Sequence, residues 1–135
     1  MPAFIDTNAI LDVTTRDPVW NPWSSGVINR HSPEGLFINS LVYSELCIGA
    51  DSIEEVDGVI KGLRLTYMEI PSSALFFAAK AFRAYRSRGG ARTSPLPDFF
   101  IGAHAKCLGL PLITRDVNRY RTYFPGVVLI TPDPS

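Results

Sequence analysis

Short apolar runs alternate with longer helix-forming segments along the whole chain, and this alternation restricts the fold more than any other feature. Each run is too short for a helix and is bounded by turn-forming residues, so it is expected to be a buried strand. The five expected strands cover residues 3–5, 36–38, 65–70, 111–114 and 127–130. Parallel strands need long crossover connections, which the intervening helices supply. The sequence therefore predicts an α/β fold with a mainly parallel five-stranded sheet and helices on both faces.

Capping residues indicate where several connecting helices begin. Asn39 or Ser40 is expected to cap a helix over residues 41–48. Ser52 begins a capping-box pattern, which predicts a helix over residues 53–63. Further helices are expected to start near residues 22, 73, 98 and 118. No internal repeat or second domain is visible in this pattern.

The composition indicates one folded domain. A chain of 135 residues with 46% apolar and 19% charged residues is long enough to bury a core and is not disordered. We expect a domain over residues 1–131 and a Pro-rich tail over residues 132–135. Because 13 basic residues balance 13 acidic ones, any affinity for nucleic acid must come from local clusters of charge.

Cysteine usage and hydropathy restrict the kind of site and the compartment. Cys47 and Cys107 lie in apolar segments without C-x-x-C spacing, so they are expected to be buried, reduced thiols and not a zinc site or a disulfide. No signal-peptide pattern and no apolar stretch of membrane-spanning length is visible. The expected location is the cytoplasm.

Four acidic residues occupy unusual positions in this pattern. Asp6 and Asp116 directly follow apolar strands, Glu45 is the only acid in an apolar helix, and Asp98 opens a helix. In open α/β sheets, ligands bind at the carboxyl ends of the strands. If the first and fourth strands are neighbours, Asp6 and Asp116 face each other there. The other two acids can reach the same place from helices packed alongside.

Simpler roles explain each of these acids individually. Asp6, Thr7 or Asn8 can cap the following helix and do nothing else. Asp98 is favoured at a helix start by the helix dipole. Glu45 can face solvent. The functional interpretation therefore depends on the four acids meeting in one pocket.

Four carboxylates in one pocket repel one another unless a cation neutralises them. An all-oxygen set of ligands favours Mg²⁺ or Mn²⁺ over zinc. His31 and His104 are expected to be structural or exposed, since neither is spaced to join the acids. One or two such ions activate water and neutralise charge during cleavage of a phosphate ester, so hydrolysis is the expected reaction.

The segments that carry the four acids resemble the four acidic motifs of the PIN domain. They read FIDTN at residues 4–8, SEL at 44–46, PDFFIGAHA at 97–105 and LITRD at 112–116. Their order and spacing, together with the chain length, are similar to those of the VapC toxins of bacterial toxin–antitoxin pairs. The resemblance covers essentially the whole chain, and no acidic position departs from the pattern.

This resemblance implies a single PIN-like domain that acts as a Mg²⁺-dependent endoribonuclease, with Mn²⁺ as a possible substitute. It further implies that the protein is the toxin of a type II toxin–antitoxin system, forms a homodimer, and is inhibited by a small antitoxin that occupies the site. The implied catalytic and metal-binding residues are Asp6, Glu45, Asp98 and Asp116. The implied orienting residues around them are Thr7, Asn8 and Thr114. Gly102 would leave room beside the metal, although a contact between helices explains a glycine there equally well.

Arginines near these acids are candidates for binding RNA phosphates. Arg86 and Arg92 precede Asp98, and Arg115 follows the fourth strand. The same two clusters also contain Arg83, Arg88, Arg119 and Arg121. For each arginine the alternative is a solvated surface role. No aromatic signature for base stacking is present.

Two other functions remain as alternatives. One is a catalytically silent PIN-like module that binds RNA or protein, against which the four acids argue. The other is a phosphatase with an aspartyl nucleophile, which also starts with a strand followed by Asp. That class needs a second Asp two residues after Asp6, where this chain has Asn8.

Overall fold

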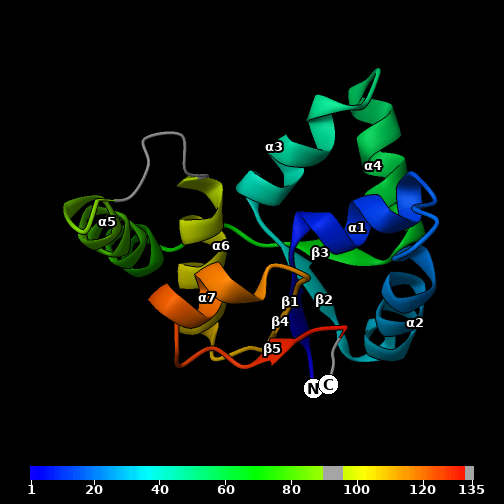
Figure 1. The fold of residues 1–135 in the computed structure, drawn as a ribbon. Coiled ribbons are helices and arrows are strands. Elements are labelled where there is room, and N and C mark those ends of the chain that lie inside the picture. The colour runs from blue at the N-terminus through cyan, green and yellow to red at the C-terminus, as the bar shows by residue number, and fades with distance from the viewer. Residues whose placement is uncertain (90–95, 133–135) are drawn as a thin grey trace.

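Five short parallel strands form one sheet at the centre of the molecule (Figure 1). A computed structural model describes residues 1–89 and 96–132. The strands are β1 (Ala3–Ile5), β2 (Leu36–Ile38), β3 (Leu65–Tyr67), β4 (Leu112–Ile113) and β5 (Leu129–Ile130). Their order is β3-β2-β1-β4-β5, and every neighbouring pair is parallel. The predicted α/β class is confirmed, and β1 pairs with β4, which is the condition for Asp6 and Asp116 to face each other.

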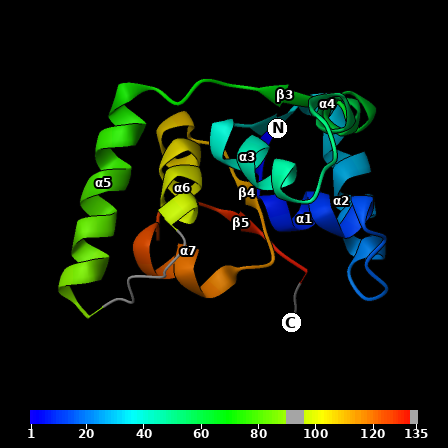
Figure 2. The same ribbon diagram turned by 90° about the horizontal axis from the view of Figure 1, so that it is seen from above.

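Helices connect successive strands and flank the sheet. They are α1 (Thr7–Thr14), α2 (Asn21–His31), α3 (Ser40–Ile48), α4 (Ile53–Gly62), α5 (Ser72–Ser87), α6 (Leu96–Leu108) and α7 (Val117–Tyr123), with a 3-10 turn at Ser32–Glu34. In both overall views α5, α6 and α7 lie to one side and α1, α2 and α4 to the other (Figures 1 and 2). None of the helices within residues 1–89 and 96–132 is long and apolar enough to cross a membrane.

The predicted helix caps are present. Asn39 caps α3, since its Oδ1 accepts hydrogen bonds from the backbone N–H groups of Leu41 (3.0 Å) and Val42 (3.2 Å). Ser52 caps α4 by accepting the N–H of Glu55 at 3.1 Å. Each cap satisfies backbone N–H groups at the start of its helix and so stabilises that start.

Three strands are shorter than predicted: β4 covers only Leu112–Ile113, and the two outermost strands are also cut short. β3 stops at Tyr67 and β5 starts only at Leu129, whereas the apolar runs extend further. Both are the outermost strands of the sheet, so each has a partner on one side only. Because the partner strands β2 and β4 are themselves three and two residues long, the apolar runs have no further ladder to join.

The central strand β1 lies in the core, and Asp6 directly follows its carboxyl end. Ala3, Phe4 and Ile5 are completely buried. The backbone N–H of Asp6 still donates to the carbonyl of Ile113 in β4 at 2.9 Å, and α1 begins at the next residue. The sheet therefore holds Asp6 rigidly at the carboxyl end of its central strand.

Aromatic packing joins α5, α6 and α7. The ring of Tyr123 lies 5.2 Å from that of Tyr85 and 5.3 Å from that of Phe99, measured between centroids. Phe82 packs edge-on against Phe99 at 5.4 Å. Such ring pairs stabilise beyond the area they bury. This cluster fixes the first turn of α6, where Asp98 lies, relative to α7.

The prediction that the two cysteines are free thiols is confirmed, but the prediction that both are buried is not. Cys47 is half-buried, whereas Cys107 is exposed. Cys107 lies near the end of α6, and the apolar stretch around it is a helix with one solvent-facing side. The prediction that both thiols are buried is therefore wrong for Cys107.

Gly102 is required by packing and does not leave room beside a metal. A Cβ atom at this position would lie 2.5 Å from Cδ2 of Phe124, whose ring is buried. The ring of Phe124 occupies the space that the side chain of any other residue would need. Of the two explanations considered from the sequence, the helix contact is the one that the structure supports.

We expect Gly102→Ala to lower the free energy of unfolding by about 1–3 kcal/mol, because the buried ring of Phe124 must shift. The matched control is Gly58→Ala, also within a helix, where a Cβ meets nothing within 4 Å. That change should leave stability unchanged or raise it by up to about 1 kcal/mol. Chemical denaturation of both variants measures the difference, and equal stability of the two would contradict the packing argument.

Candidate functional site

The four acids line one pocket at the carboxyl end of the sheet. The pocket has a volume of about 500 Å³ and is lined by residues of α1, α3 and α6 and by residues next to their ends and before α7. It is lined by Asp6, Thr7, Asn8, Leu11, Thr15, Glu45, Ile48, Gly49, Asp98 and Asp116. Side chains separated by up to 110 residues in the sequence are thus brought together by this strand order.

Asp6 is the most enclosed of the acids, with 4% of its surface exposed. Its Oδ1 accepts the backbone N–H of Thr7 at 2.8 Å, so it caps α1 as well as facing the pocket. Its Oδ2 accepts from Oγ1 of Thr114 (2.7 Å), the hydroxyl of Tyr120 (3.2 Å) and Nδ2 of Asn8 (3.3 Å). Asp6 therefore both caps α1 and lines the pocket.

Burial raises the pKa of Asp6 to about 7, and the nearby charge of Asp98 adds to the effect. The hydrogen bonds from Thr114 and Thr7 act in the opposite direction but do not cancel it. The pocket therefore disfavours the ionised form of Asp6 unless a positive charge is added.

Glu45 reaches the pocket from α3 and is held by Thr7. The hydroxyl of Thr7 donates to Oε1 of Glu45 at 2.6 Å. Since Thr7 also gives its N–H to Asp6, one residue positions two acids.

Asn39 and His104 tie the helix of Glu45 to the helix of Asp98. Nδ2 of Asn39 lies 3.1 Å from Nδ1 of His104. Because Oδ1 of Asn39 accepts the cap hydrogen bonds of α3, its amide nitrogen donates to His104, which places the imidazole proton on Nε2. Burial lowers the pKa of His104, so the ring is neutral. A structural role for His104 agrees with the prediction.

Arg119 bridges the remaining two acids. Its Nη1 donates to Oδ2 of Asp98 and, at 3.0 Å, to Oδ2 of Asp116. Burial raises the pKa of Asp98 to about 6 even though the hydrogen bond and charge of Arg119 lower it, and Asp116 and Glu45 raise it further. Asp116 is the most open member of this group, with 37% of its side chain exposed.

The acids fit a hard divalent cation by their chemistry but are not arranged around one point. Among residues 1–89 and 96–132, no three acidic, His or Cys side chains stand close enough together to hold an ion as they lie. Arg119 occupies Asp98 and Asp116, and Thr7 occupies Glu45. The donor set consists only of carboxylate oxygens, the type that Mg²⁺ and Mn²⁺ prefer.

The three residues expected to orient the acids all contact them or one another. Thr114 donates to Asp6 and accepts the backbone N–H of Asp116 at 2.9 Å, so it links two acids. Asn8 donates to Asp6 and to Oγ1 of Thr114, both at 3.3 Å. Tyr120, which sequence reasoning missed, also reaches Asp6. Its only sequence signal is the four-residue spacing from Asp116 in a short helix.

The three arginines predicted to bind RNA differ in their surroundings. Arg86 lies in the last turn of α5, with its guanidinium 6.0 Å from the ring centroid of Phe82. Arg92 lies outside the described residues. Arg115 forms a bidentate ion pair with Asp12, in which Nε lies 2.8 Å from Oδ2 and Nη2 lies 2.9 Å from Oδ1.

The Asp12 carboxylate explains why Arg115 is held inward. Asp12 is 3% exposed and also accepts the hydroxyl of Ser24 at 2.7 Å. The guanidinium of Arg115 lies 5.0 Å from the ring centroid of Trp20. This arrangement joins α1, α2 and the end of β4, and no sequence pattern pointed to Asp12.

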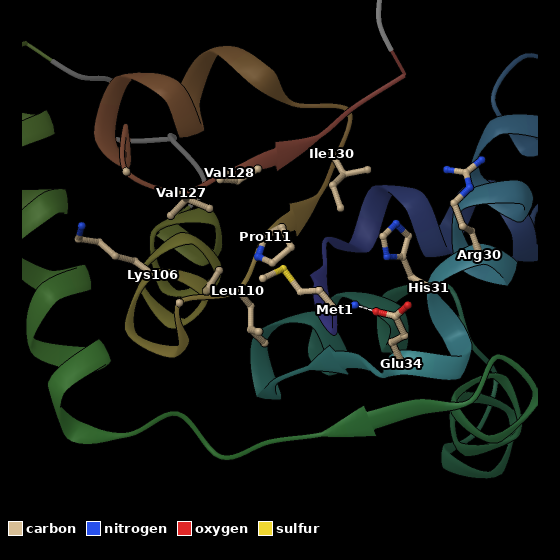
Figure 3. Close-up of a pocket in the computed structure, with 13 residues that line it drawn as sticks. Met1, Arg30, His31, Glu34, Lys106, Leu110, Pro111, Val127, Val128 and Ile130 are labelled. Carbon is tan, nitrogen blue, oxygen red and sulfur yellow. Dashed lines mark ion pairs between the residues drawn. The ribbon is translucent and has the colours of Figure 1, made fainter.

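A second pocket of about 490 Å³ lies at the opposite, amino-terminal end of the central strands (Figure 3). Its walls are mainly apolar, including Leu110 and Val127, and its one acid, Glu34, pairs with the terminal amine of Met1. Figure 3 shows Lys106 on one side of the pocket and the other charged side chains across from it. It contains none of the four predicted acids, so it is not the candidate active site.

Residues 3–125 match the family model described as the PIN domain. Among solved structures, the fold is similar to VapBC2 from Rickettsia felis bound to a DNA fragment from their promoter, with 17% identity, a TM-score of 0.74, and 97% of this chain and 98% of that chain covered. DNA-bound VapBC from Salmonella typhimurium is 24% identical, with a TM-score of 0.72 and 98% of both chains covered.

A toxin-antitoxin complex from Klebsiella pneumoniae is 21% identical, with a TM-score of 0.70 and 96% of this chain and 97% of that chain covered. No match was found among curated protein sequences. At these identities the structural likeness shows a shared fold.

We expect Arg115→Ala to destabilise the protein by about 3 kcal/mol, because it leaves the buried carboxylate of Asp12 without its partner. Arg121→Ala, which removes an exposed arginine of α7, should change stability by less than about 0.5 kcal/mol. Denaturant unfolding of both variants measures this. Normal stability of Arg115→Ala combined with weaker RNA binding would instead support the role predicted from sequence.

In the metal-free protein, Asp6→Asn should gain stability relative to wild type as the pH rises from about 4 to about 7. The pKa of Asp6 rises on folding from 3.8 to about 7, so its favourable contribution is complete below the lower value and lost through the upper one. An amide at this position does not titrate. In EDTA, the difference in melting temperature between Asp6→Asn and wild type should change by several degrees across this range, in favour of the variant.

The matched control for this pH series is Asp51→Asn, at an exposed position outside the pocket. Its melting temperature should run parallel to that of wild type. Parallel curves for Asp6→Asn as well would show that the carboxyl group of Asp6 does not have a raised pKa.

Proposed function

Because the chain belongs to the PIN domain family, we propose that it is a Mg²⁺-dependent endoribonuclease and the toxin of a type II toxin–antitoxin system. The observation that carries this proposal is the meeting of Asp6, Glu45, Asp98 and Asp116 in one pocket at the carboxyl end of a parallel sheet. Asp6 and Asp116 follow strands β1 and β4, and Asp98 lies in the first turn of α6. The sheet and a helix start therefore fix three of the four acids in place.

In this proposal the four acids hold the metal, with Mn²⁺ able to replace Mg²⁺. The bound cation would activate water for attack on a phosphodiester and neutralise charge as the P–O bond breaks. Thr114 and Thr7 fix the orientation of Asp6 and Glu45 by the hydrogen bonds described above. A raised pKa for Asp6 without metal means that proton release and metal binding are coupled at this residue.

RNA must approach the pocket along a positively charged path. We propose that Arg86 and Arg92 contribute phosphate contacts, since both precede Asp98 in the chain. Arg115 is less suited to this role because its guanidinium is already bound to Asp12.

The proposed partners are a small antitoxin and a second copy of this chain, in the cytoplasm. The similar solved structures include toxin–antitoxin assemblies. Beside the acids, the pocket has exposed apolar side chains, Leu11 at 37% and Ile48 at 85% exposure. Such residues favour a protein partner that covers the pocket when the enzyme is inactive.

One observation favours the alternative of a catalytically silent PIN-like module. The ion pairs of Arg119 already satisfy two of the four acids without any metal. The two functions differ in whether the acids are needed for RNA cleavage.

We expect Asp6→Asn and Asp98→Asn each to reduce cleavage of an RNA substrate by about 100-fold or more, and excess EDTA to abolish it. Growth arrest on expression should disappear with both variants. Cleavage is followed by gel electrophoresis with purified protein, and circular dichroism checks that each variant is folded.

Asp51→Asn serves as the matched control, since it removes an exposed carboxylate outside the pocket and should cleave as wild type does. Undiminished cleavage by either pocket variant, or in EDTA, would reject the metal mechanism. Folded wild-type protein that binds RNA without cutting it would support the silent module.

A further inference from the structure

A single nitrogen of Arg119 is shared between two acids of the pocket. Nη1 contacts Oδ2 of both Asp98 and Asp116. Two carboxylate oxygens converging on one positive atom is the arrangement that a shared metal ion also requires. In this structure a side chain supplies the positive charge.

Within residues 1–89 and 96–132, Arg119 is the only residue that forms an ion pair with any of the four acids, and it pairs with two of them, Asp98 and Asp116. The other arginine near the end of β4, Arg115, is bound to Asp12. The remaining ion pair joins the terminal amine of Met1 to Glu34, beside the second pocket. Loss of the guanidinium of Arg119 would therefore leave Asp98 and Asp116 to repel each other, unless another cation took its place.

The surroundings of Arg119 allow it to leave without disturbing the helix. Its side chain is 27% exposed, so one side faces solvent. The next residue, Tyr120, is completely buried and bound to Asp6, so α7 is anchored by a different side chain. Movement of the guanidinium thus requires only a change of rotamer.

We propose that Arg119 is an exchangeable counter-cation, which holds Asp98 and Asp116 together in the metal-free protein and is displaced when a divalent cation binds. This inference rests on the proposed function, since it assumes that the acids take up a metal. Two consequences follow from the charges. Metal must compete with the guanidinium, so Arg119 lowers metal affinity, and the metal-free pocket needs Arg119 for stability.

The first test is a Mn²⁺ titration of the full chain without RNA, with free Mn²⁺ measured by electron paramagnetic resonance. Arg119→Gln should bind Mn²⁺ about tenfold more tightly than wild type, because the competing charged hydrogen bonds are gone. Arg119→Lys, which keeps the charge, should stay close to wild type. Arg121→Gln removes an equal charge from an exposed position of the same helix and should have little effect.

Melting in EDTA tests the second consequence, that the metal-free pocket needs Arg119 for stability. Arg119→Gln should melt several degrees lower than wild type without metal, and saturating Mn²⁺ should close most of that gap. A structural ion pair that stays in place would instead give a loss of stability that metal does not repair.

The third test follows the wild-type protein, and a variant is used only to identify one signal. In protein labelled with ¹⁵N-arginine, the Nε–H signal of Arg119 should shift during a Mg²⁺ titration in step with metal occupancy. The signal of Arg115, which is bound to Asp12 outside the pocket, should shift much less. Comparison with the spectrum of Arg119→Lys identifies the signal.

The outcomes separate this inference from the proposed function. Metal binding with unchanged affinity in Arg119→Gln, or an Nε–H signal of Arg119 that does not move, overturns the exchange but leaves the nuclease proposal standing. No Mn²⁺ binding by wild-type protein overturns both. Tighter binding in Arg119→Gln together with a shifting signal supports the exchange even if the RNA substrate is never found.

Discussion

The burial of the Asp6 carboxylate at the end of the central strand is the constraint on which the pocket depends. A carboxylate with 4% exposure is costly unless donors surround it. Thr114, directly after strand β4, supplies its hydroxyl, α1 supplies its first N–H group, and α7 supplies Tyr120. Three elements are therefore positioned by one carboxyl group, and contacts of Thr7 and Thr114 link it to Glu45 and Asp116.

Two arginines that are four residues apart in the sequence serve the fold in different ways. Arg115 satisfies both oxygens of a buried carboxylate with two nitrogens and stacks near an indole ring, so its position is fixed. Arg119 offers one nitrogen to two acids at the mouth of the pocket and has a solvent-facing side. Counting basic residues in the sequence does not separate these roles, because the difference lies in the partner that each one meets.

Local signals made much of this structure predictable. Apolar runs followed by Asp placed β1 and β4, and the caps at Asn39 and Ser52 placed two helices, since these effects act within a few residues. The strand pattern and the family resemblance also led us to expect the four acids in one pocket, but other contacts between distant segments were not predictable. The pairing of Asp12 with Arg115 is one example, and the filling of the space beside Gly102 by Phe124 is another. Both depend on tertiary packing that no short pattern encodes.

Asp6 both caps α1 and lines the pocket. This affects which substitutions such a chain can accept once the proposed activity is no longer selected. Replacing Asp6 removes a helix cap and several buried hydrogen bonds, so the chain risks degradation. Asp116 is 37% exposed and makes no side-chain cap, so its loss spares the fold. Folded descendants that have lost the proposed activity should therefore retain the first acid and differ at the last, so the presence of Asp6 alone would be a poor marker of nuclease activity.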